Sequence, residues 1–350
     1  MIYETSIIID AQVLNLIAEL DEFKGRWEML GRLAPDKLHS LRRVATIESV
    51  GSSTRIEGAK LSDQDVELLL SNLDIRSFFS RDEEEVAGYA EVMETVFTSW
   101  EHIPFTENHI KQLHGMLLKY SSKDQTHRGD YKKLTNNVEA FDADGKSLGV
   151  IFETASPFET PHIMADLLAR TSQALASREM HPLLLIAAFV VHFLAIHPFQ
   201  DGNGRLSRVL TTLLLLQAGY RYVPYCSLER IIEDNKDGYY RALRLSQKKI
   251  RTADEKLDDW VRFFLQSLKK QKDILLRKVE QEKLLEGLSP TSEQLLVLAR
   301  ERGRLTISEA VTLLGINRNT IKLHLRQLVH QGYLYQHGSG KATWYSSAKE

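Results

Sequence analysis

The sequence predicts a mainly α-helical protein with one small β-hairpin in its core and a winged helix-turn-helix unit near its C-terminal end. Three observations support this fold class. Apolar residues recur at helical spacing through most of the chain up to Glu286. One segment, His127–Pro161, is poor in helix signals and contains two extended stretches around a turn. The last segment, Pro290–Tyr345, alternates short helical patterns with turns and finishes in a hairpin pattern.

Composition limits the class of protein. The chain has 350 residues and a net charge of −2, so it can form two or three domains, and its overall charge indicates neither nucleic acid nor membrane binding. The single cysteine, Cys226, excludes an intramolecular disulfide framework. The apolar run Pro182–Phe199 approaches the length of a membrane span, but His192 and His197 interrupt it, so we expect a buried helix. We therefore expect a cytoplasmic protein without membrane contact, and both a monomer and a homodimer remain open.

Pattern changes along the chain indicate four segments: an N-terminal helical region over 1–95, a core over 96–265, a linker helix over 266–288, and the winged helix-turn-helix domain over 289–350. In the first segment, apolar spacing predicts a helix over Asp36–Ile56 that Gly58 stops. Ser62 should cap the next helix together with Asp65. The acidic cluster Asp82–Glu85 marks the start of another helix.

The segment His197–Arg208 is the most informative part of the sequence. Apolar helices are predicted before it, over Pro182–Ile196, and after it, over Val209–Leu216. Gly202–Gly204 therefore lie at the N-terminus of the second helix. Free backbone N–H groups and the helix dipole make such a position an anion site, and glycines let phosphate oxygens approach the main chain.

Four side chains of this segment suit nucleotide chemistry. His197 could take a proton from an attacking hydroxyl, and Asp201 offers the hard oxygen ligand that Mg²⁺ takes beside phosphates. Arg205 and Arg208 are three residues apart, so one helix face would direct both toward the same anion. The sequence has no Gly-x-x-x-x-Gly-Lys-Ser/Thr loop, so an ordinary kinase or NTPase has no support.

This segment resembles the signature of the Fic family, His-x-Phe-x-Asp/Glu-Gly-Asn-Gly-Arg-x-x-Arg, with every specified position filled. A looser resemblance extends over roughly residues 40–270. The resemblance implies a Fic-type helical core and an enzyme that moves AMP from ATP, with Mg²⁺, to a Ser, Thr or Tyr hydroxyl of a target protein or of itself. It implies that His197 is the base and Asp201 the magnesium ligand. The residues implied to hold the phosphates are Gly202, Asn203, Gly204, Arg205 and Arg208.

A second motif, from Ser53 to Gly58, resembles the inhibitory Ser/Thr-x-x-x-Glu-Gly/Asn motif of one Fic class. Ser53 and Glu57 are four residues apart, so they lie on one helix face near its C-terminal end. A carboxylate at that position could pair with Arg208 and take the place of the γ-phosphate. The motif alone would be an ordinary helix end, but together with the signature it indicates autoinhibition by Glu57.

The resemblance also interprets the inserted hairpin. Asp142–Gly145 is predicted to form a turn, and Val150, Ile151 and Phe152 belong to the strand after it. This strand occupies the place of the family's flap, which docks an extended target segment by strand addition. An ordinary surface hairpin is the alternative.

Two further parts of the sequence correspond to the family pattern, one of them with a changed residue. The pattern Gly-x-Tyr-Arg has a lysine at its last position here, Lys132, which keeps the charge but loses the planar fork of arginine. Tyr239 and Tyr240 match aromatic residues that flank the nucleotide in the family. Core packing is the competing role for both tyrosines.

In the C-terminal segment, helices are predicted over Ser292–Arg300, Glu309–Leu314 and Arg318–Val329, followed by a hairpin around Gly338–Gly340. This order resembles a winged helix-turn-helix domain. Residues 289–350 carry eight basic and four acidic side chains, a modest excess that favours DNA phosphates. Winged helices also serve as protein-contact modules. The side chains that would face DNA are Arg318, Asn319, Lys322 and Arg326.

Three functions remain open. The first is an AMP transferase that Glu57 inhibits. In the second, Glu57 orients a water at the same site, and the enzyme removes AMP from a modified protein. The third is a DNA-binding transcriptional regulator whose Fic site senses a nucleotide. The intact His197 and Asp201 favour an enzyme, because a sensor needs neither a base nor a metal ligand.

Overall fold

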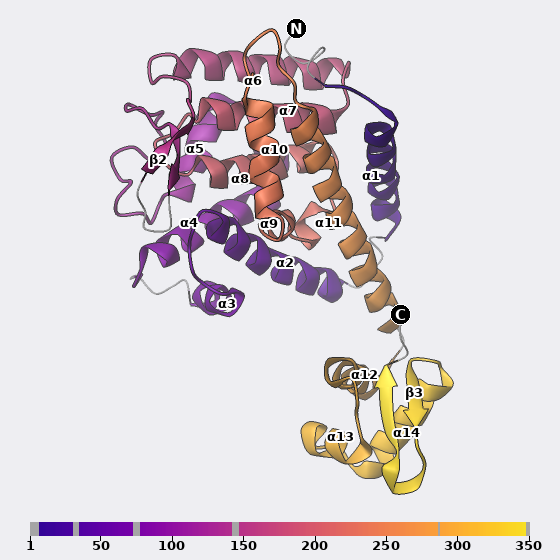
Figure 1. Ribbon diagram of the computed structural model, residues 1–350. Coiled ribbons are helices and arrows are strands. Elements are labelled where there is room, and N and C mark those ends of the chain that lie inside the picture. Colours follow the sequence, from indigo (N-terminus) through magenta and orange to yellow (C-terminus); the bar gives the residue numbers. More distant parts are fainter. Residues whose placement is uncertain (1–6, 31–34, 73–77, 142–146, 286–287, 348–350) are drawn as a thin grey trace. The chain divides into compact units, whose positions relative to one another are not determined.

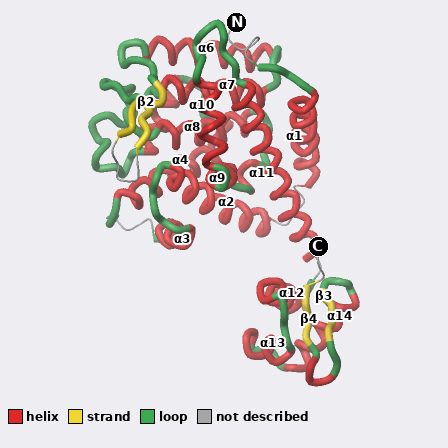
Figure 2. The backbone as a smooth tube through the Cα atoms, in the orientation of Figure 1, coloured by secondary structure: helices red, strands yellow, loops and turns green. Residues whose placement is uncertain are grey.

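The computed structural model describes residues 7–30, 35–72, 78–141, 147–285 and 288–347. The fold is mainly helical with two small antiparallel sheets, which confirms the predicted fold class (Figures 1 and 2). The chain forms two compact units, Met1–Leu276 and Arg277–Glu350. The boundary expected near residue 95 falls inside the helix Arg81–Ser99, and the N-terminal helices belong to the same unit as the core. No helix in the described ranges is long and apolar enough to cross a membrane.

The first unit consists of helices and, at its edge, the hairpin of β1 and β2 (Figure 1). Its elements in chain order are α1 (Ala11–Leu30), α2 (Pro35–Ile56), α3 (Asp63–Ser71), α4 (Arg81–Ser99), η1 (Trp100–His102), α5 (Glu107–Leu117), β1 (Val138–Phe141), β2 (Ser147–Phe152), α6 (Thr160–Ser177), α7 (Pro182–Ile196), α8 (Asn203–Gln217), η2 (Val223–Tyr225), α9 (Leu228–Glu233), α10 (Lys236–Gln247) and α11 (Asp258–Leu285). Helix α11 continues into the second unit.

Two apolar helices form the centre of this unit. Every residue of α7 from Leu183 to Ile196 is buried, and α8 is buried over most of its length. The two helices pack against each other, with α6 on α7 and α4 on α8 (Figure 1). The loop that joins α7 to α8 carries the predicted signature. The hydrophobic core therefore fixes both ends of that loop.

The N-terminal helices have the predicted ends. Helix α2 stops at Ile56, and Gly58 follows with φ +109°, a left-handed value that glycine adopts without a Cβ clash. Ser62 and Asp65 form a complete capping box at α3. Helix α2 packs against α9 and α4. These contacts bring the end of α2 next to the start of α8.

The inserted hairpin consists of β1 and β2, which pair antiparallel with Val138 opposite Phe152 and Glu139 opposite Val150. The pairing has two irregularities. The turn expected at Asp142–Gly145 lies outside the described residues. The strand expected at 149–152 is the end of β2.

The second unit has the predicted order of helices and strands. It contains α12 (Pro290–Arg302), α13 (Ile307–Leu314), α14 (Arg318–His330), β3 (Leu334–His337), η3 (Gly340–Ala342) and β4 (Trp344–Ser347). Ile321, Leu325 and Leu328 of α14 are fully buried in the core of this unit. Strand β4 pairs with β3, and its Tyr345 also forms a bridge to Leu305. This is a winged helix-turn-helix arrangement.

Candidate active site

The loop between α7 and α8 is held by two amide side chains, the buried Asn203 and the half-buried Asn136. His197 ends α7 in the left-handed conformation, with φ 54° and ψ 59°. Asn203 receives the N–H of Phe199 at 2.9 Å and donates to the carbonyl of Phe199 at 2.7 Å. Asn136 donates to the carbonyls of His197 and Phe199 at 3.1 and 2.6 Å. The side chain of Asn203 therefore fixes the loop, which leaves its backbone N–H for an anion.

The ring of His197 is set up as a neutral base. Its Nδ1 lies 3.3 Å from the carbonyl oxygen of Leu194. Because a carbonyl only accepts, Nδ1 carries the hydrogen and Nε2 is the nitrogen that can take a proton. Burial lowers the pKa of His197 to about 4, although the Leu194 contact opposes this. His197 is therefore neutral at physiological pH.

Lys132 connects the hairpin to this loop. Its ammonium donates to Asn136 Oδ1 at 2.7 Å, to Thr154 Oγ1 at 2.9 Å and to the carbonyl of Ile196 at 3.0 Å. All three donors of the buried ammonium are thus used. Burial lowers the pKa of Lys132 to about 8. Lysine thus takes the place of the arginine in the family pattern. It donates one hydrogen bond to Ile196 at the end of α7 and one to Thr154, just after the end of β2.

Asp201 lies between two arginines. Its Oδ1 accepts the N–H of Gly202 at 2.5 Å and meets Arg205 at 3.2 Å, while its Oδ2 meets Arg81 of α4 at 3.2 Å. Burial would raise the pKa of Asp201, but the charge of Arg205 and the bond from Gly202 lower it. Among the described residues no three His, Cys, Asp or Glu side chains cluster as a metal site. A single carboxylate fits Mg²⁺ that takes its other ligands from phosphates and water.

Glu57 is bound to Arg208. Arg208 donates to Glu57 Oε1 at 2.8 Å, to Ser53 Oγ at 2.8 Å and to the Ser53 carbonyl at 2.9 Å. Arg208 and Ser53 are buried. Burial would raise the pKa of Glu57, but Arg208, with Arg205 and His197, lowers it. Glu57 is therefore an anion held by the end of α2.

The carboxylate of Glu57 lies directly over Gly204, in the space that a Cβ at this position would occupy. Gly204 is in the first turn of α8, where unpaired N–H groups and the positive end of the dipole attract anions. Glu57 thus occupies the anion position that the sequence predicted for a phosphate. Arg205 and Arg208 do not share one anion here, because Arg205 pairs with Glu85 and Asp201 instead.

A cavity of about 250 Å³ opens in front of these groups. Tyr239 lines it and also packs against Trp260, so its ring serves both the cavity and the core. From the hairpin, Ile151 and Phe152 reach the cavity, while Val150 does not and is 50% exposed. The remaining residues around the cavity include Glu57, His197, Asp201, Gly202, Asn203, Gly204, Arg205, Tyr240 and Arg244.

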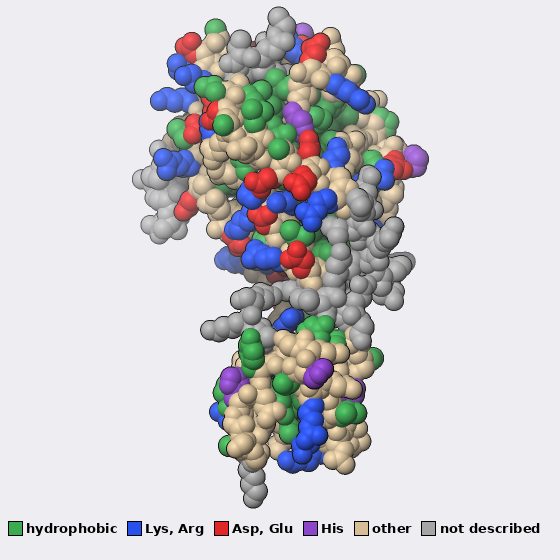
Figure 3. Space-filling model, turned by 90° about the vertical axis from the view of Figure 1, so that its right-hand side faces the viewer, with side chains coloured by type: hydrophobic (Ala, Val, Ile, Leu, Met, Phe, Trp, Pro, Cys, Tyr) green, Lys and Arg blue, Asp and Glu red, His purple; other side chains and the backbone are tan. Residues whose placement is uncertain are grey.

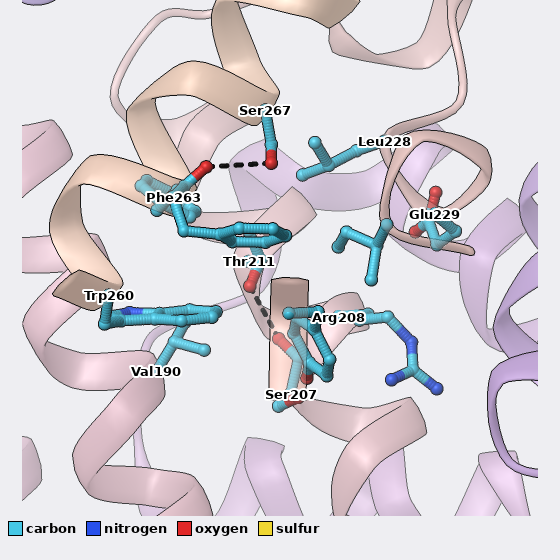
Figure 4. A pocket seen from close by; sticks show the side chains of 12 residues that line it. Val190, Ser207, Arg208, Thr211, Leu228, Glu229, Trp260, Phe263 and Ser267 are labelled. Atoms are coloured by element: carbon cyan, nitrogen blue, oxygen red, sulfur yellow. Dashed lines mark hydrogen bonds between the residues drawn. The ribbon is translucent and has the colours of Figure 1, made fainter. Parts of the chain in front are cut away.

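A second cavity, of about 20 Å³, adjoins Arg208 (Figure 4). It is mostly apolar, with Trp260 and Phe263 on one side, and it has room for one water. Thr211 turns its hydroxyl to the carbonyl of Ser207, as the dashed line in Figure 4 shows. This cavity is too small for a nucleotide. The larger cavity in front of His197 is the candidate site.

Sequence reasoning missed His114 of α5. Its Nδ1 accepts the N–H of Gly129 at 2.8 Å, so its Nε2 carries the hydrogen and donates to the Asp201 carbonyl at 3.0 Å. The ring stacks on Phe199 at 3.8 Å between centroids. Burial lowers the pKa of His114 to about 4. His114 thus holds the loop through the Asp201 carbonyl and the Phe199 ring, a role that no local sequence pattern indicates.

The predicted DNA-facing residues of the second unit lie on one exposed surface. Arg318, Asn319, Lys322 and Arg326 are all exposed on α14, to one side of its buried residues. In Figure 3 the visible face of this unit carries blue Lys and Arg side chains, whereas blue and red side chains mix on the first unit. This basic helix face is available to a partner.

Comparisons with known proteins agree with this architecture. A model of the Fic/DOC family matches residues 104–215, and a model of the IclR helix-turn-helix domain matches residues 295–338. A Fido domain-containing protein from Dictyostelium discoideum is 33% identical over 104 residues, which are 28% of this chain and 67% of that protein. These matches define a Fic-fold protein with an appended helix-turn-helix domain. The chain belongs to the Fic/DOC family.

Two further relatives show how much of each chain the similarity covers. The protein adenylyltransferase Fic of Drosophila ananassae is 34% identical over 100 residues, which are 29% of this chain and only 18% of that protein. The crystal structure of a Fic family protein from Desulfovibrio desulfuricans G20 aligns over 99% of both chains with a TM-score of 0.62 and 23% identity. At this identity the likeness concerns the fold alone.

Proposed function

We propose that this protein is an adenylyltransferase that transfers AMP from Mg·ATP to a Ser, Thr or Tyr hydroxyl of a target protein, and that Glu57 inhibits it. The observation that supports this most is the cavity that combines a neutral His197 with the glycine-rich N-terminus of α8. The Drosophila relative, which is named a protein adenylyltransferase, agrees with this reaction class.

The residues suit each part of the reaction. The target hydroxyl oxygen bonds to the α-phosphorus, the bond from the α-phosphorus to the oxygen bridging to the β-phosphorus breaks, and pyrophosphate leaves. Nε2 of His197 takes the hydroxyl proton. The N–H groups at the start of α8 face the phosphates. Asp201 would hold Mg²⁺, which would neutralise phosphate charge as the pyrophosphate departs.

Target binding belongs to the hairpin in this proposal. Phe152 and Ile151 line the cavity while Val150 faces outward. An extended target segment that adds to β2 would present its hydroxyl near His197. Lys132 and Asn136 hold this hairpin against the loop, so the distance between flap and base is fixed.

Intact-mass spectrometry tests the proposal. Purified protein and its Glu57→Gly variant are incubated with Mg·ATP, alone and with a cell lysate. We expect Glu57→Gly to add one AMP group to itself or to a lysate protein, and Glu57→Gly with His197→Ala to add none. Absence of AMP transfer by Glu57→Gly would overturn the proposal. Loss of AMP from a modified protein on incubation with the wild type alone would favour AMP removal instead.

The second unit supports a second candidate function, DNA binding. The match to an IclR helix-turn-helix domain and the exposed basic residues Arg318, Lys322 and Arg326 favour it. The recognition helix of such a domain enters the major groove. An electrophoretic shift of duplex DNA at low salt tests this binding.

A further inference from the structure

Four charged side chains form a closed ring beside the cavity. Arg81, the first residue of α4, donates from Nε to Glu85 Oε1 at 2.7 Å, and its Nη2 lies 3.2 Å from Asp201 Oδ2. Arg205 closes the ring, with Nη1 2.9 Å from Glu85 Oε2 and Nη2 3.2 Å from Asp201 Oδ1. Each carboxylate oxygen of the ring therefore meets a guanidinium.

The two arginines differ in their surroundings. The side chain of Arg205 is 3% exposed, whereas that of Arg81 is 51% exposed. Oδ1 of Asp201 is also held by the N–H of Gly202. Oδ1 therefore belongs to the buried side of the ring, while Oδ2 meets the arginine that can move into solvent. Oδ2 is thus the oxygen that another cation could take with the least rearrangement.

We propose that Arg81 competes with Mg²⁺ for Asp201 and so acts as a second brake on the site. This inference rests on the proposed function, because it concerns the same metal ligand. A guanidinium and a metal ion at Oδ2 repel each other at such short range, so the binding of one disfavours the other. When Oδ2 is taken, Arg81 can keep its bond to Glu85 and turn away from Asp201.

This brake differs from the one at Glu57. Glu57 occupies the phosphate position over Gly204 and pairs with Arg208, whereas Arg81 acts on the carboxylate of Asp201. The two contacts come from different helices, α2 and α4. Removing Glu57 should leave the Arg81 brake in place. Because the Arg81–Asp201 pair is half exposed, we expect it to weaken metal binding by only about two- to five-fold.

Nucleotide binding with and without metal tests this competition. The full chain with Glu57→Gly binds α,β-methylene ATP in a calorimeter, once with EDTA and once with saturating Mg²⁺. The dissociation constant in EDTA divided by that with Mg²⁺ gives the ratio by which the metal strengthens binding. A general loss of positive charge near the phosphates would weaken binding in EDTA, where the analogue carries the larger negative charge, whereas release of Asp201 should strengthen binding with Mg²⁺ and leave binding in EDTA unchanged. We expect Arg81→Gln to increase the ratio about two- to five-fold and Arg81→Lys to change it less.

The control is Arg42→Gln, which removes a comparable exposed pair, with Glu94 of α4, away from the site. An unchanged or smaller ratio for Arg81→Gln, with analogue binding intact, would overturn the inference. A ratio raised only by weaker binding in EDTA would also overturn it, because Arg81 would then be a phosphate ligand. Failure of every variant, Glu57→Gly alone included, to bind the analogue would overturn the proposed function itself. Thermal unfolding of Arg81→Gln near the midpoint of its parent excludes misfolding as the cause.

Discussion

At the scale of single residues, the state of His197 follows from its position. The helix end turns its backbone into the left-handed region, and the Leu194 carbonyl binds one ring nitrogen. Burial then lowers its pKa to about 4. A base with this pKa is free to accept a proton throughout the physiological range. In the proposed reaction, metal and phosphate-binding groups would assist this weak base by stabilising the charge that develops during the attack.

Replacing this base gives the first prediction. In the Glu57→Gly background, His197→Ala should lower AMP transfer by about 10²–10⁴-fold, the usual cost of losing a positioned base. Binding of an ATP analogue should persist, because the glycine-rich start of α8 and Arg205 remain. Rates of AMP incorporation and calorimetric affinities check the two parts. Parent-like transfer would remove His197 from its proposed role.

Two imidazoles, those of the buried His114 and the half-buried His197, predict a pH dependence of stability. Burial lowers the pKa of both His114 and His197 from 6.5 to about 4. As pH falls from 6.5 toward 4, the unfolded chain takes up protons that the folded chain does not, so the free energy of unfolding decreases. Each shift corresponds to about 3 kcal/mol over this window. Urea unfolding at pH 7, 6 and 5 should show the decline, and His114→Gln should make it shallower. An equal slope in that variant would contradict the assignment.

At the scale of elements, helix α2 positions the carboxylate that inhibits the enzyme in the proposed function. The pairing of Arg55 with Glu233 and Asp63 anchors its end to α9 and α3, with Arg55 Nε 2.6 Å from Glu233. This anchor fixes Glu57 over the start of α8. The proposed inhibition is thus part of the packing of the first unit, in which one carboxylate would take the place of a phosphate.

Removal of Glu57 gives the third prediction. Glu57→Gly should raise AMP transfer, because Arg208 becomes free to bind the γ-phosphate and align the α-phosphate. A misplacement of about 1 Å can cost about 10²-fold in rate, so the gain can reach this size. Adding Arg208→Ala should cancel it, and Glu57→Gln should give an intermediate rate. Equal activity of wild type and Glu57→Gly across ATP concentrations would reduce the motif to a helix end.

The hairpin depends on one buried ammonium. Lys132→Met should leave the Ile196 carbonyl without its Lys132 donor and the Asn136 oxygen with Thr154 Oγ1 as its remaining donor, at a cost of about 1–3 kcal/mol. Because those groups join the hairpin to the loop, residues 136–154 should exchange amide hydrogens faster, and AMP transfer should fall more than ATP affinity. Lys132→Arg tests whether a planar donor can restore both. Unchanged exchange in Lys132→Met would show that the strand pairing alone holds the hairpin.

The helices were predictable because their signals are local. Periodic apolar residues, the Ser62 cap and the stop at Gly58 each act within a few positions. The signature loop was predictable for the same reason. The partners of its charges were not, because Arg81 and Asp201 are 120 positions apart. Spacing within α8 directed Arg205 and Arg208 to one anion, but carboxylates from α4 and α2 bind them separately.

At the scale of the whole molecule, the chain combines the proposed nucleotide site with a basic helix face. The two units have separate hydrophobic cores, and the second is built around Leu295, Ile321 and Leu325. Each core buries its own apolar residues, so each unit can keep its fold without the other. The two proposed functions can therefore be separated by cutting the chain.

The last prediction makes this cut after Glu286, just past the end of α11. The truncated protein with Glu57→Gly should transfer AMP like the full-length variant, because α7, α8 and the cavity lie in the first unit. It should no longer shift duplex DNA, since the exposed basic residues of α14 are gone. Within the full chain, Arg318→Ala with Lys322→Ala should lower the salt dependence of DNA binding by about one counterion per lost phosphate contact. The matched control, Arg300→Ala with Arg302→Ala, removes equal charge from α12 and should have a smaller effect. A shift that survives truncation would place the DNA contacts on the first unit.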